Sequence, residues 1–398
     1  MDRRCPFSLP QQHFGLFSSM SHLLSSLVRH SEFTLKPLST ATMASSAGIK
    51  TRICMISDTH TAVPYPPLET SYAYRSPLPR ADVLLHGGDL TKVGYSVEHE
   101  AMVSMLKAAN AELKLVIAGN HDITLDEEHF TSFGYRRHRR PEWLGGQGIL
   151  LEDDEKSLTN AIRAGDVPPA DKMQAYVRRV KDLYTNESAR AAGIRYLEEG
   201  VHSFTLSNGA KLTIYASPYQ PEFCRWAFAY PRSQDRFNPP LPGSSNPAPA
   251  NPVPDYPNVD IMLTHGPPAH VLDLVGQDEG HHQHVGCQHL LRAAERARPR
   301  LYMFGHIHEG WGAIRGSWNA FANGGLKQEE VPTDKEDMLE RRAAYYDISS
   351  ESARPLRVGA ETLFVNASIM TLGYHPYNAP WVVDLDLPRA DAQMQSLV

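Results

Sequence analysis

The segment Arg300–Gly312 reads RLYMFGHIHEGWG, an apolar run followed at once by His306 and His308, with glycines outside the two histidines. Taken alone, it fits a strand end with two half-exposed histidines. Four other apolar runs are followed by similar polar residues. They are RICMIS before DTH, DVLLHG before GDLT, LKLVIA before GNHD, and VDIMLT before HGPP. Five runs of strand length, rich in Val, Ile, Leu and Met, predict strands buried on both faces.

Helices are predicted between these strands. The stretch 96–112 places Met102 and Leu106 on one apolar face, and the stretch 287–300 has a similar face. This alternation of strands and helices predicts α/β layers. In such layers the loops that follow the strands gather at one edge, so the polar residues after the five runs are expected to meet there.

Composition narrows the class of protein. The chain has 398 residues, of which 41% are hydrophobic, and a formal net charge of −6. This acidic balance disfavours a general nucleic-acid binder, and no apolar stretch is long enough to cross a membrane. The four cysteines follow no disulfide or metal spacing, which favours a reduced, cytoplasmic protein.

The domain organisation is expected to be simple. Residues 1–49 are rich in Ser, Leu and His with few acids, which is typical of a disordered or targeting segment. Residues 1–42 are either a mitochondrial transit peptide or an extension upstream of Met43. Residues 50–390 are predicted to form one domain with two insertions. These are about 126–199, whose best helix is the stretch 171–199, and about 231–258, which is rich in proline.

The side chains that follow the five strands are carboxylates, imidazoles and one amide, which are suitable ligands for Zn, Fe or Mn. They are Asp58, His60, Asp89, Asn120, His121, His265, His306 and His308. The absence of thiolates argues against a structural zinc site. The number of ligands exceeds one tetrahedral site and fits two metals that share a bridging carboxylate.

The order D-x-H, G-D, G-N-H-D, H and G-H-x-H resembles the calcineurin-like metallophosphoesterase superfamily. The words ISDTH, LVIAGNHDITLD, SPYQPEFCRWAF and FGHIHEGWG most resemble its MPPED-type class, and the similarity covers about residues 51–387. The resemblance implies an α/β fold, a metallophosphoesterase-type β-sandwich of two mixed sheets flanked by helices. It also implies two transition-metal ions (Mn, Fe or Zn), with manganese expected for activity.

The resemblance also assigns roles to individual residues. One metal would be bound by Asp58, His60 and His308. The other would be bound by Asn120, His265 and His306, and Asp89 would bridge the two. His121 would stand beside the substrate as the acid for the leaving group, and Asp122 would hold the His121 ring.

The implied function is a dinuclear metal-dependent phosphoesterase, in which a metal-bridging hydroxide attacks a small-molecule or nucleotide phosphodiester. Nucleic acids and membranes are not expected partners. A Ser/Thr protein phosphatase, acting on phosphomonoesters, is one alternative. Those enzymes carry Asp-Arg after G-D, whereas GGDLTKVG offers only Lys92, which lacks the bidentate fork of arginine. A nuclease of the same superfamily is disfavoured by the acidic balance, and a non-catalytic scaffold by the complete ligand set.

Overall fold

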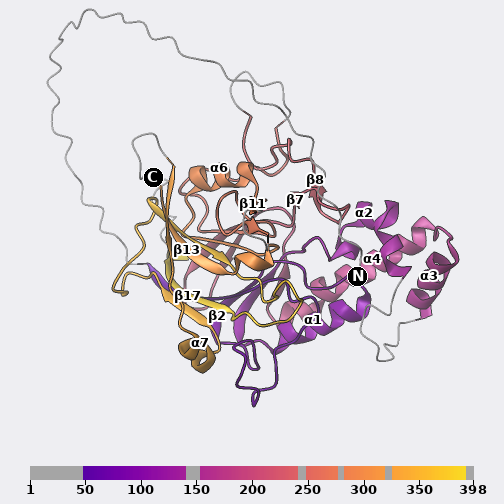
Figure 1. Ribbon diagram of the computed structural model, residues 1–398, viewed down its shortest axis with the longest axis horizontal. Helices are drawn as coiled ribbons and strands as arrows, with labels where there is room; N and C mark the ends of the chain where they lie inside the picture. Colours follow the sequence, from indigo (N-terminus) through magenta and orange to yellow (C-terminus); the bar gives the residue numbers. More distant parts are fainter. Residues whose placement is uncertain (1–47, 140–152, 241–247, 277–281, 319–324, 391–398) are drawn as a thin grey trace, which may run out of the picture. The chain divides into compact units, whose positions relative to one another are not determined.

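The computed structural model describes residues 48–139, 153–240, 248–276, 282–318 and 325–390. The predicted N-terminal segment, residues 1–49, lies almost wholly outside this range. The described residues form two large mixed sheets with helices on their outer faces (Figure 1). In the described part of the chain, no helix combines the length and apolar character that a bilayer crossing requires.

The first sheet has six strands. In spatial order they are β15 (Ala344–Asp347), β17 (Trp381–Leu387), β1 (Ile49–Ile56), β2 (Ala81–His86), β3 (Ala111–Val116) and β4 (Ile194–Tyr196). β1 runs parallel to β2, with Ile56 opposite His86, and antiparallel to β17. The loops after β1 and β2 therefore leave the sheet side by side. They stay joined, because the Asp58 amide donates to the Gly88 carbonyl at 2.9 Å.

The second sheet has seven strands. In spatial order they are β14 (Leu326–Glu330), β13 (Gly312–Trp318), β16 (Glu361–Asn366), β12 (Leu301–Phe304), β9 (Ile261–Thr264), β6 (Lys211–Ser217) and β5 (Gly200–Thr205). β6, β9, β12 and β16 are parallel, so their carboxyl ends share one edge. The Gly305 amide donates to the His265 carbonyl at 3.0 Å, which joins the loops after β12 and β9.

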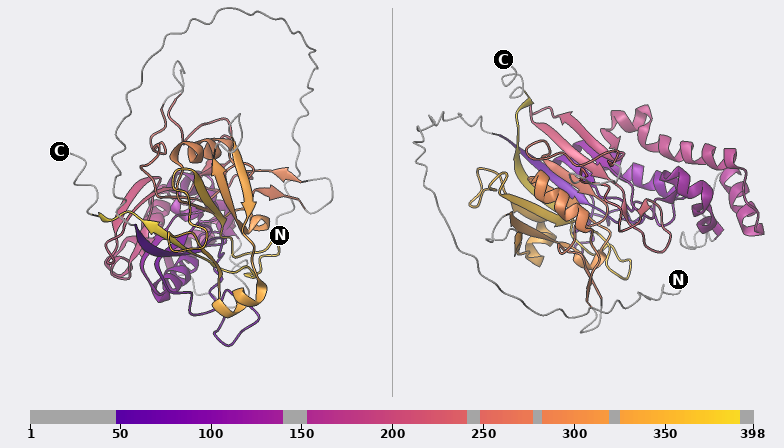
Figure 2. Two further views of the ribbon diagram at one scale, coloured as in Figure 1. Left: turned by 90° about the vertical axis from the view of Figure 1, so that its left-hand side faces the viewer. Right: turned by 90° about the horizontal axis from the view of Figure 1, so that it is seen from above.

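Alternating side chains build the layers. Along β1, Ile53 and Met55 point between the two sheets, whereas Cys54 and Ile56 face the helices. The helices α1 (Ser96–Ala108) and α4 (Ala170–Thr185) cover the outer face of the first sheet. The helix α6 (Gln288–Ala297) covers that of the second (Figures 1 and 2). The predicted α/β sandwich is thus confirmed.

Shorter elements complete the fold. They are the 3₁₀ turns η1 (Ile123–Leu125), η2 (Gly134–Arg139) and η4 (His308–Gly310), the helices α2 (Glu127–Ser132), α3 (Asp153–Ala164), α5 (Glu187–Ala191) and α7 (Lys335–Arg341), and the strand pairs β7 (Gln220–Pro221) with β8 (Ala229–Tyr230) and β10 (Leu274–Val275) with β11 (Gln283–His284).

Two predicted helices are too long. The helix predicted over 96–112 ends at Ala108, and Ala111 already begins β3. The helix predicted over 171–199 is divided into α4, α5 and β4. Its break is at Asn186, whose side chain accepts a hydrogen bond from the Ala189 amide and caps α5. Both helices were predicted to continue into residues that instead form β3 and β4. These residues become strands by pairing with other strands of the sheet, which local sequence does not show. The domain and insertion limits stay predictions.

Candidate metal centre

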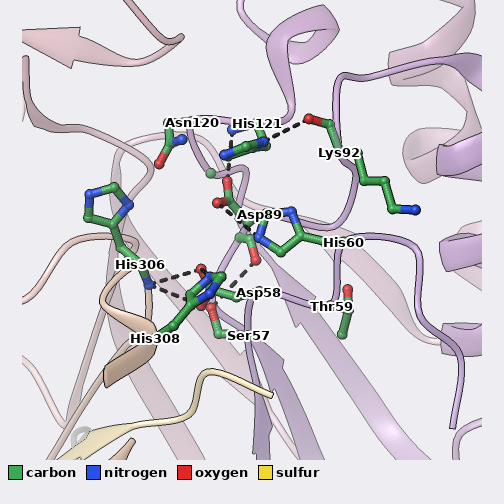
Figure 3. Close-up of polar contacts among 12 residues, drawn as sticks. Ser57, Asp58, Thr59, His60, Asp89, Lys92, Asn120, His121, His306 and His308 are labelled. Carbon is green, nitrogen blue, oxygen red and sulfur yellow. Dashed lines mark hydrogen bonds and ion pairs between the residues drawn. The ribbon is translucent and has the colours of Figure 1, made fainter. Parts of the chain in front are cut away.

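The loops after β1, β2, β3, β9 and β12 bring the seven predicted ligands and His121 into one cluster. Figure 3 shows this cluster, with all of these residues labelled except His265. Donor atoms lie within 4.8 Å of one another in three groups of His and Asp. These are Asp58 with His60 and His308, Asp89 with His265 and His306, and His60 with Asp89 and His121. Asn120 joins the second group, because its Oδ1 lies 2.9 Å from His265 Nε2. The first two groups match the two predicted ligand sets.

The backbone is sharply turned at four of the predicted ligands. Positive φ angles occur at Asp58 (53°), His60 (42°), Asp89 (52°) and His306 (65°). Each such angle costs a residue with a Cβ roughly 1–2 kcal/mol. Strain of this kind persists where it serves a site, and here it turns each side chain inward directly after its strand.

Backbone carbonyls orient four of the histidine rings through Nδ1. The pairs are His60 with Thr91 (3.1 Å), His121 with Lys92 (2.7 Å), His265 with Gly87 (2.9 Å) and His308 with Thr371 (3.2 Å). A ring that donates from Nδ1 keeps a lone pair on Nε2, as a metal ligand requires. The Nε2 atom of His60 is buried with no hydrogen-bond partner in the protein, 3.6 Å from Asp89 Oδ2. A metal ion would satisfy this orphaned atom.

The charges of the site also fit a cation. Burial holds the pKa of His60 well below its usual value and lowers the pKa of His306 to about 3, so both rings are neutral bases. Burial, together with the Asp58 and Asp122 carboxylates, raises the pKa of Asp89 well above its usual value. A buried carboxylate whose ionisation is disfavoured by burial and by neighbouring carboxylates, next to the neutral rings of His60 and His306, forms a site that bound cations would stabilise.

The pKa of His308 is shifted in the opposite direction from those of His60 and His306. Burial lowers its pKa, but the hydrogen bond and the charge of Asp58 outweigh burial and raise it above the ordinary value. His308 Nε2 lies 3.6 Å from Asp58 Oδ1, and the same carboxylate accepts the His306 amide at 3.0 Å. Asp58 therefore organises both histidines of the G-H-x-H segment.

The predicted contact between Asp122 and the His121 ring is wrong. The Asp122 carboxylate accepts hydrogen bonds from the amides of Gly119 (2.8 Å) and Thr91 (2.8 Å) and from the Thr91 hydroxyl (2.7 Å). The His121 ring is held by the Lys92 carbonyl instead. Asp122 points toward the backbone because these amides need an acceptor, which its carboxylate supplies. The sequence does not show that a backbone carbonyl, that of Lys92, would hold the His121 ring instead. Asp122 thus joins the loops after β2 and β3.

Two aromatic residues at the centre were not predicted to have a role. The ring of Trp226 stacks on His121 at 4.0 Å, and the Arg137 guanidinium lies 3.4 Å from the Trp226 ring centroid. The ring of Tyr374 lies 5.0 Å from that of His60. Trp226 belongs to SPYQPEFCRWAF, where a role could have been sought. Nothing in the sequence around Tyr374 points to the centre.

Comparisons with known proteins show which family the chain is similar to. The family model described as calcineurin-like phosphoesterase matches residues 51–310. Metallophosphoesterase domain-containing protein 1 of Homo sapiens and that of Mus musculus are each 29% identical over 340 residues, which cover 85% of this chain and 72% of the relative. A crystal structure of a Thermus thermophilus protein is 13% identical with a TM-score of 0.32, covering 67% of this chain and 84% of that chain. The chain thus belongs to the calcineurin-like phosphoesterase family, within its MPPED-type class, and is a metal-dependent phosphoric ester hydrolase.

Proposed function

We propose that this hydrolase holds two transition-metal ions and acts on phosphodiesters of small molecules or nucleotides. The observation that carries the proposal is the complete donor set, divided into two groups with Asp89 within reach of both. His60 Nε2 lies 3.6 Å from Asp89 Oδ2, and His265 Nε2 lies 3.4 Å from Asp89 Oδ1. Each oxygen of one carboxylate thus faces a different group, as a bridging ligand would.

Asp58, His60 and His308 would hold one ion, and Asn120, His265 and His306 the other. When bound, such ions supply Lewis acidity toward a phosphoryl group and a nucleophile from water near neutral pH. Imidazole with carboxylate suits Mn, Fe or Zn, and we propose manganese for activity. The protein holds the rings in the correct tautomer before any ion arrives, because backbone carbonyls occupy Nδ1 of three of these histidines.

His121 is proposed to assist the leaving group. Its ring is fixed between the Lys92 carbonyl and Trp226, and one ring nitrogen lies within 4.8 Å of donor atoms of His60 and Asp89. Burial lowers the pKa of His121 to about 3 in the free protein. An anionic phosphate ester beside the ring shifts the equilibrium toward the protonated form, which is the form that can donate a proton to the leaving group.

The position of Lys92 supports a diester substrate. Its carbonyl holds His121, while its side chain leads away from the ligands (Figure 3). A phosphomonoester carries a second negative charge, for which this lysine supplies no bidentate partner. A diester, with one negative charge, has less need of one.

The test compares bis(p-nitrophenyl) phosphate with p-nitrophenyl phosphate on protein loaded with manganese. We expect a higher kcat/KM for the diester and no turnover of either ester after metal removal. His306→Ala should lose both metal and turnover. The matched control is His284→Ala, since His284 is an exposed histidine paired with Asp273. A preference for the monoester, or full turnover without metal, would overturn the proposal.

A further inference from the structure

We propose that Tyr374 is a substrate-binding residue whose hydroxyl donates a hydrogen bond to a phosphoryl oxygen of the bound ester. This inference rests on the proposed phosphoesterase centre and names a residue that the metal ligands and His121 do not include. It is argued from the position of the ring, the backbone at Tyr374 and the hydrogen-bonding needs of a phosphate.

The ring lies at the boundary between the ligands and solvent. It meets His60 at 5.0 Å and His308 at 5.4 Å, with its plane inclined by 61° and 73° to theirs. Those two histidines are 1% and 10% exposed in their side chains, whereas Tyr374 is 51% exposed. Tyr374 is therefore open to solvent on one side while its ring contacts the rings of His60 and His308 on the other.

One tight turn both holds a ligand and presents the tyrosine. The Tyr374 amide donates to the Thr371 carbonyl at 2.9 Å, and the same carbonyl accepts His308 Nδ1 at 3.2 Å. The position of Tyr374 over the centre is therefore tied to the orientation of His308. Any shift of this turn would move both residues together.

The backbone at Tyr374 is costly for an aromatic residue. Its φ is 57°, in the region that glycine and asparagine tolerate and bulky residues avoid. A ring that is half exposed recovers only part of this cost through burial. Strain of this kind is often found at functional sites, and here it occurs beside the proposed centre.

The centre is rich in acceptors and poor in donors. The Asp58 and Asp89 carboxylates already take the nearby amides of His306 and His121, and the unprotonated ring nitrogens accept. A phosphate ester offers only acceptor oxygens, so it needs donors besides the ions. In the described part of the chain, the Tyr374 hydroxyl has no hydrogen-bond partner among the contacts of the fold, and a phenol can supply that donor.

The first test replaces the hydroxyl alone. Tyr374→Phe should lower kcat/KM for bis(p-nitrophenyl) phosphate by about 10- to 100-fold, the range for a hydrogen bond to a charged oxygen. Manganese content should stay unchanged, because the hydroxyl is not a ligand. The matched control is Tyr377→Phe. Tyr377 is also 51% exposed and lies in the same loop, but its ring packs on Tyr72 and it should behave like wild type. Wild-type kcat/KM in Tyr374→Phe would overturn the inference.

A second measurement does not depend on turnover. Inorganic phosphate, titrated calorimetrically into the manganese-loaded protein, should bind more weakly to Tyr374→Phe than to wild type, and equally to Tyr377→Phe. Tyr374→Asn should bind phosphate as weakly as Tyr374→Phe, with a Tm equal to or above that of wild type, because asparagine tolerates the positive φ. If wild type hydrolyses only the monoester, the diester proposal fails while phosphate binding still tests Tyr374. Equal phosphate affinity in all variants would refute the role of Tyr374 alone.

Discussion

Replacing Gly305 with alanine should remove metal from the centre without changing a ligand. Gly305 stands between Phe304 and His306, where the chain leaves β12. An added Cβ would lie 2.1 Å from Asp58 Oδ2 and 2.2 Å from Ser57 Oγ. The backbone at this position is not in the left-handed region, so alanine is acceptable there apart from the space that its methyl group needs.

The size of the effect follows from these distances. Real Cβ atoms do not approach other atoms closer than 3.0 Å, so a carboxylate oxygen at 2.1 Å must move by about 0.9 Å. Metal–ligand distances tolerate only about 0.2 Å. Asp58 is fully buried and bound to the His306 amide, which leaves it little room. We expect the metal affinity of the group formed by Asp58, His60 and His308 to fall by at least roughly 100-fold. Overpacking should cost about 1–3 kcal/mol of folding stability.

The assay is elemental analysis of manganese per chain after dialysis, with thermal unfolding measured in parallel. If wild type holds the two proposed ions, Gly305→Ala should hold one ion or fewer and should lose turnover. The control is Gly165→Ala, because an added Cβ at Gly165 meets nothing within 4 Å but takes on a strained φ of 92°. This control should lower Tm without changing metal content. Two ions and normal turnover in Gly305→Ala would refute the assigned position of Asp58.

Four further outcomes are expected. Asp89→Asn should weaken the binding of both proposed ions, because one oxygen of Asp89 faces His60 and the other faces His265. Full metal occupancy by elemental analysis would contradict this. His121→Gln should lose about 10²–10⁴-fold on alkyl esters and far less on p-nitrophenyl esters, with metal unchanged; parallel plots of log rate against leaving-group pKa would exclude the acid role. Glu98→Gln should give a milder form of the His121→Gln defect, because the Glu98 carboxylate accepts the Lys92 amide at 2.9 Å and the Lys92 carbonyl holds the His121 ring. The NH₂ group of glutamine could face the Lys92 amide, which is also a donor. An unchanged dependence of rate on leaving-group pKa would argue against this role. Manganese affinity should fall as the pH is lowered, because Asp58 raises the pKa of His308 above its ordinary value and a proton there competes with the ion; chelator competition on either side of neutral pH measures this, and equal affinities would contradict it.

The parts of the fold that sequence could predict are those with a local signal. Apolar runs located the five strands that precede the ligands, and β17 begins and ends where WVVDLDL does. Strand β4 gave no such signal, since Ile194–Tyr196 is only three residues long and becomes a strand by pairing with β3. Helix ends were misplaced for the same reason.

The sequence predicts which side chains gather in the cluster, but it does not predict which atoms orient them. Side-chain types and spacing identify donors such as Asp58 and His308. The atoms that orient them include the backbone carbonyls of Thr91 and Thr371, and any residue at those positions would supply the same oxygen. Tyr374 reaches the centre through a turn far along the chain, which no spacing reveals.

The positive φ angles at four of the ligands have a consequence for laboratory evolution. Glycine at Asp58, His60, Asp89 or His306 would relax the backbone by up to roughly 1 kcal/mol each, while removing a predicted ligand. A library selected for heat resistance in the presence of a chelator, with no screen for turnover, should therefore accumulate glycine at these four positions. Thermostable variants of this enzyme should be selected with metal present, so that ligand binding opposes the relief of strain.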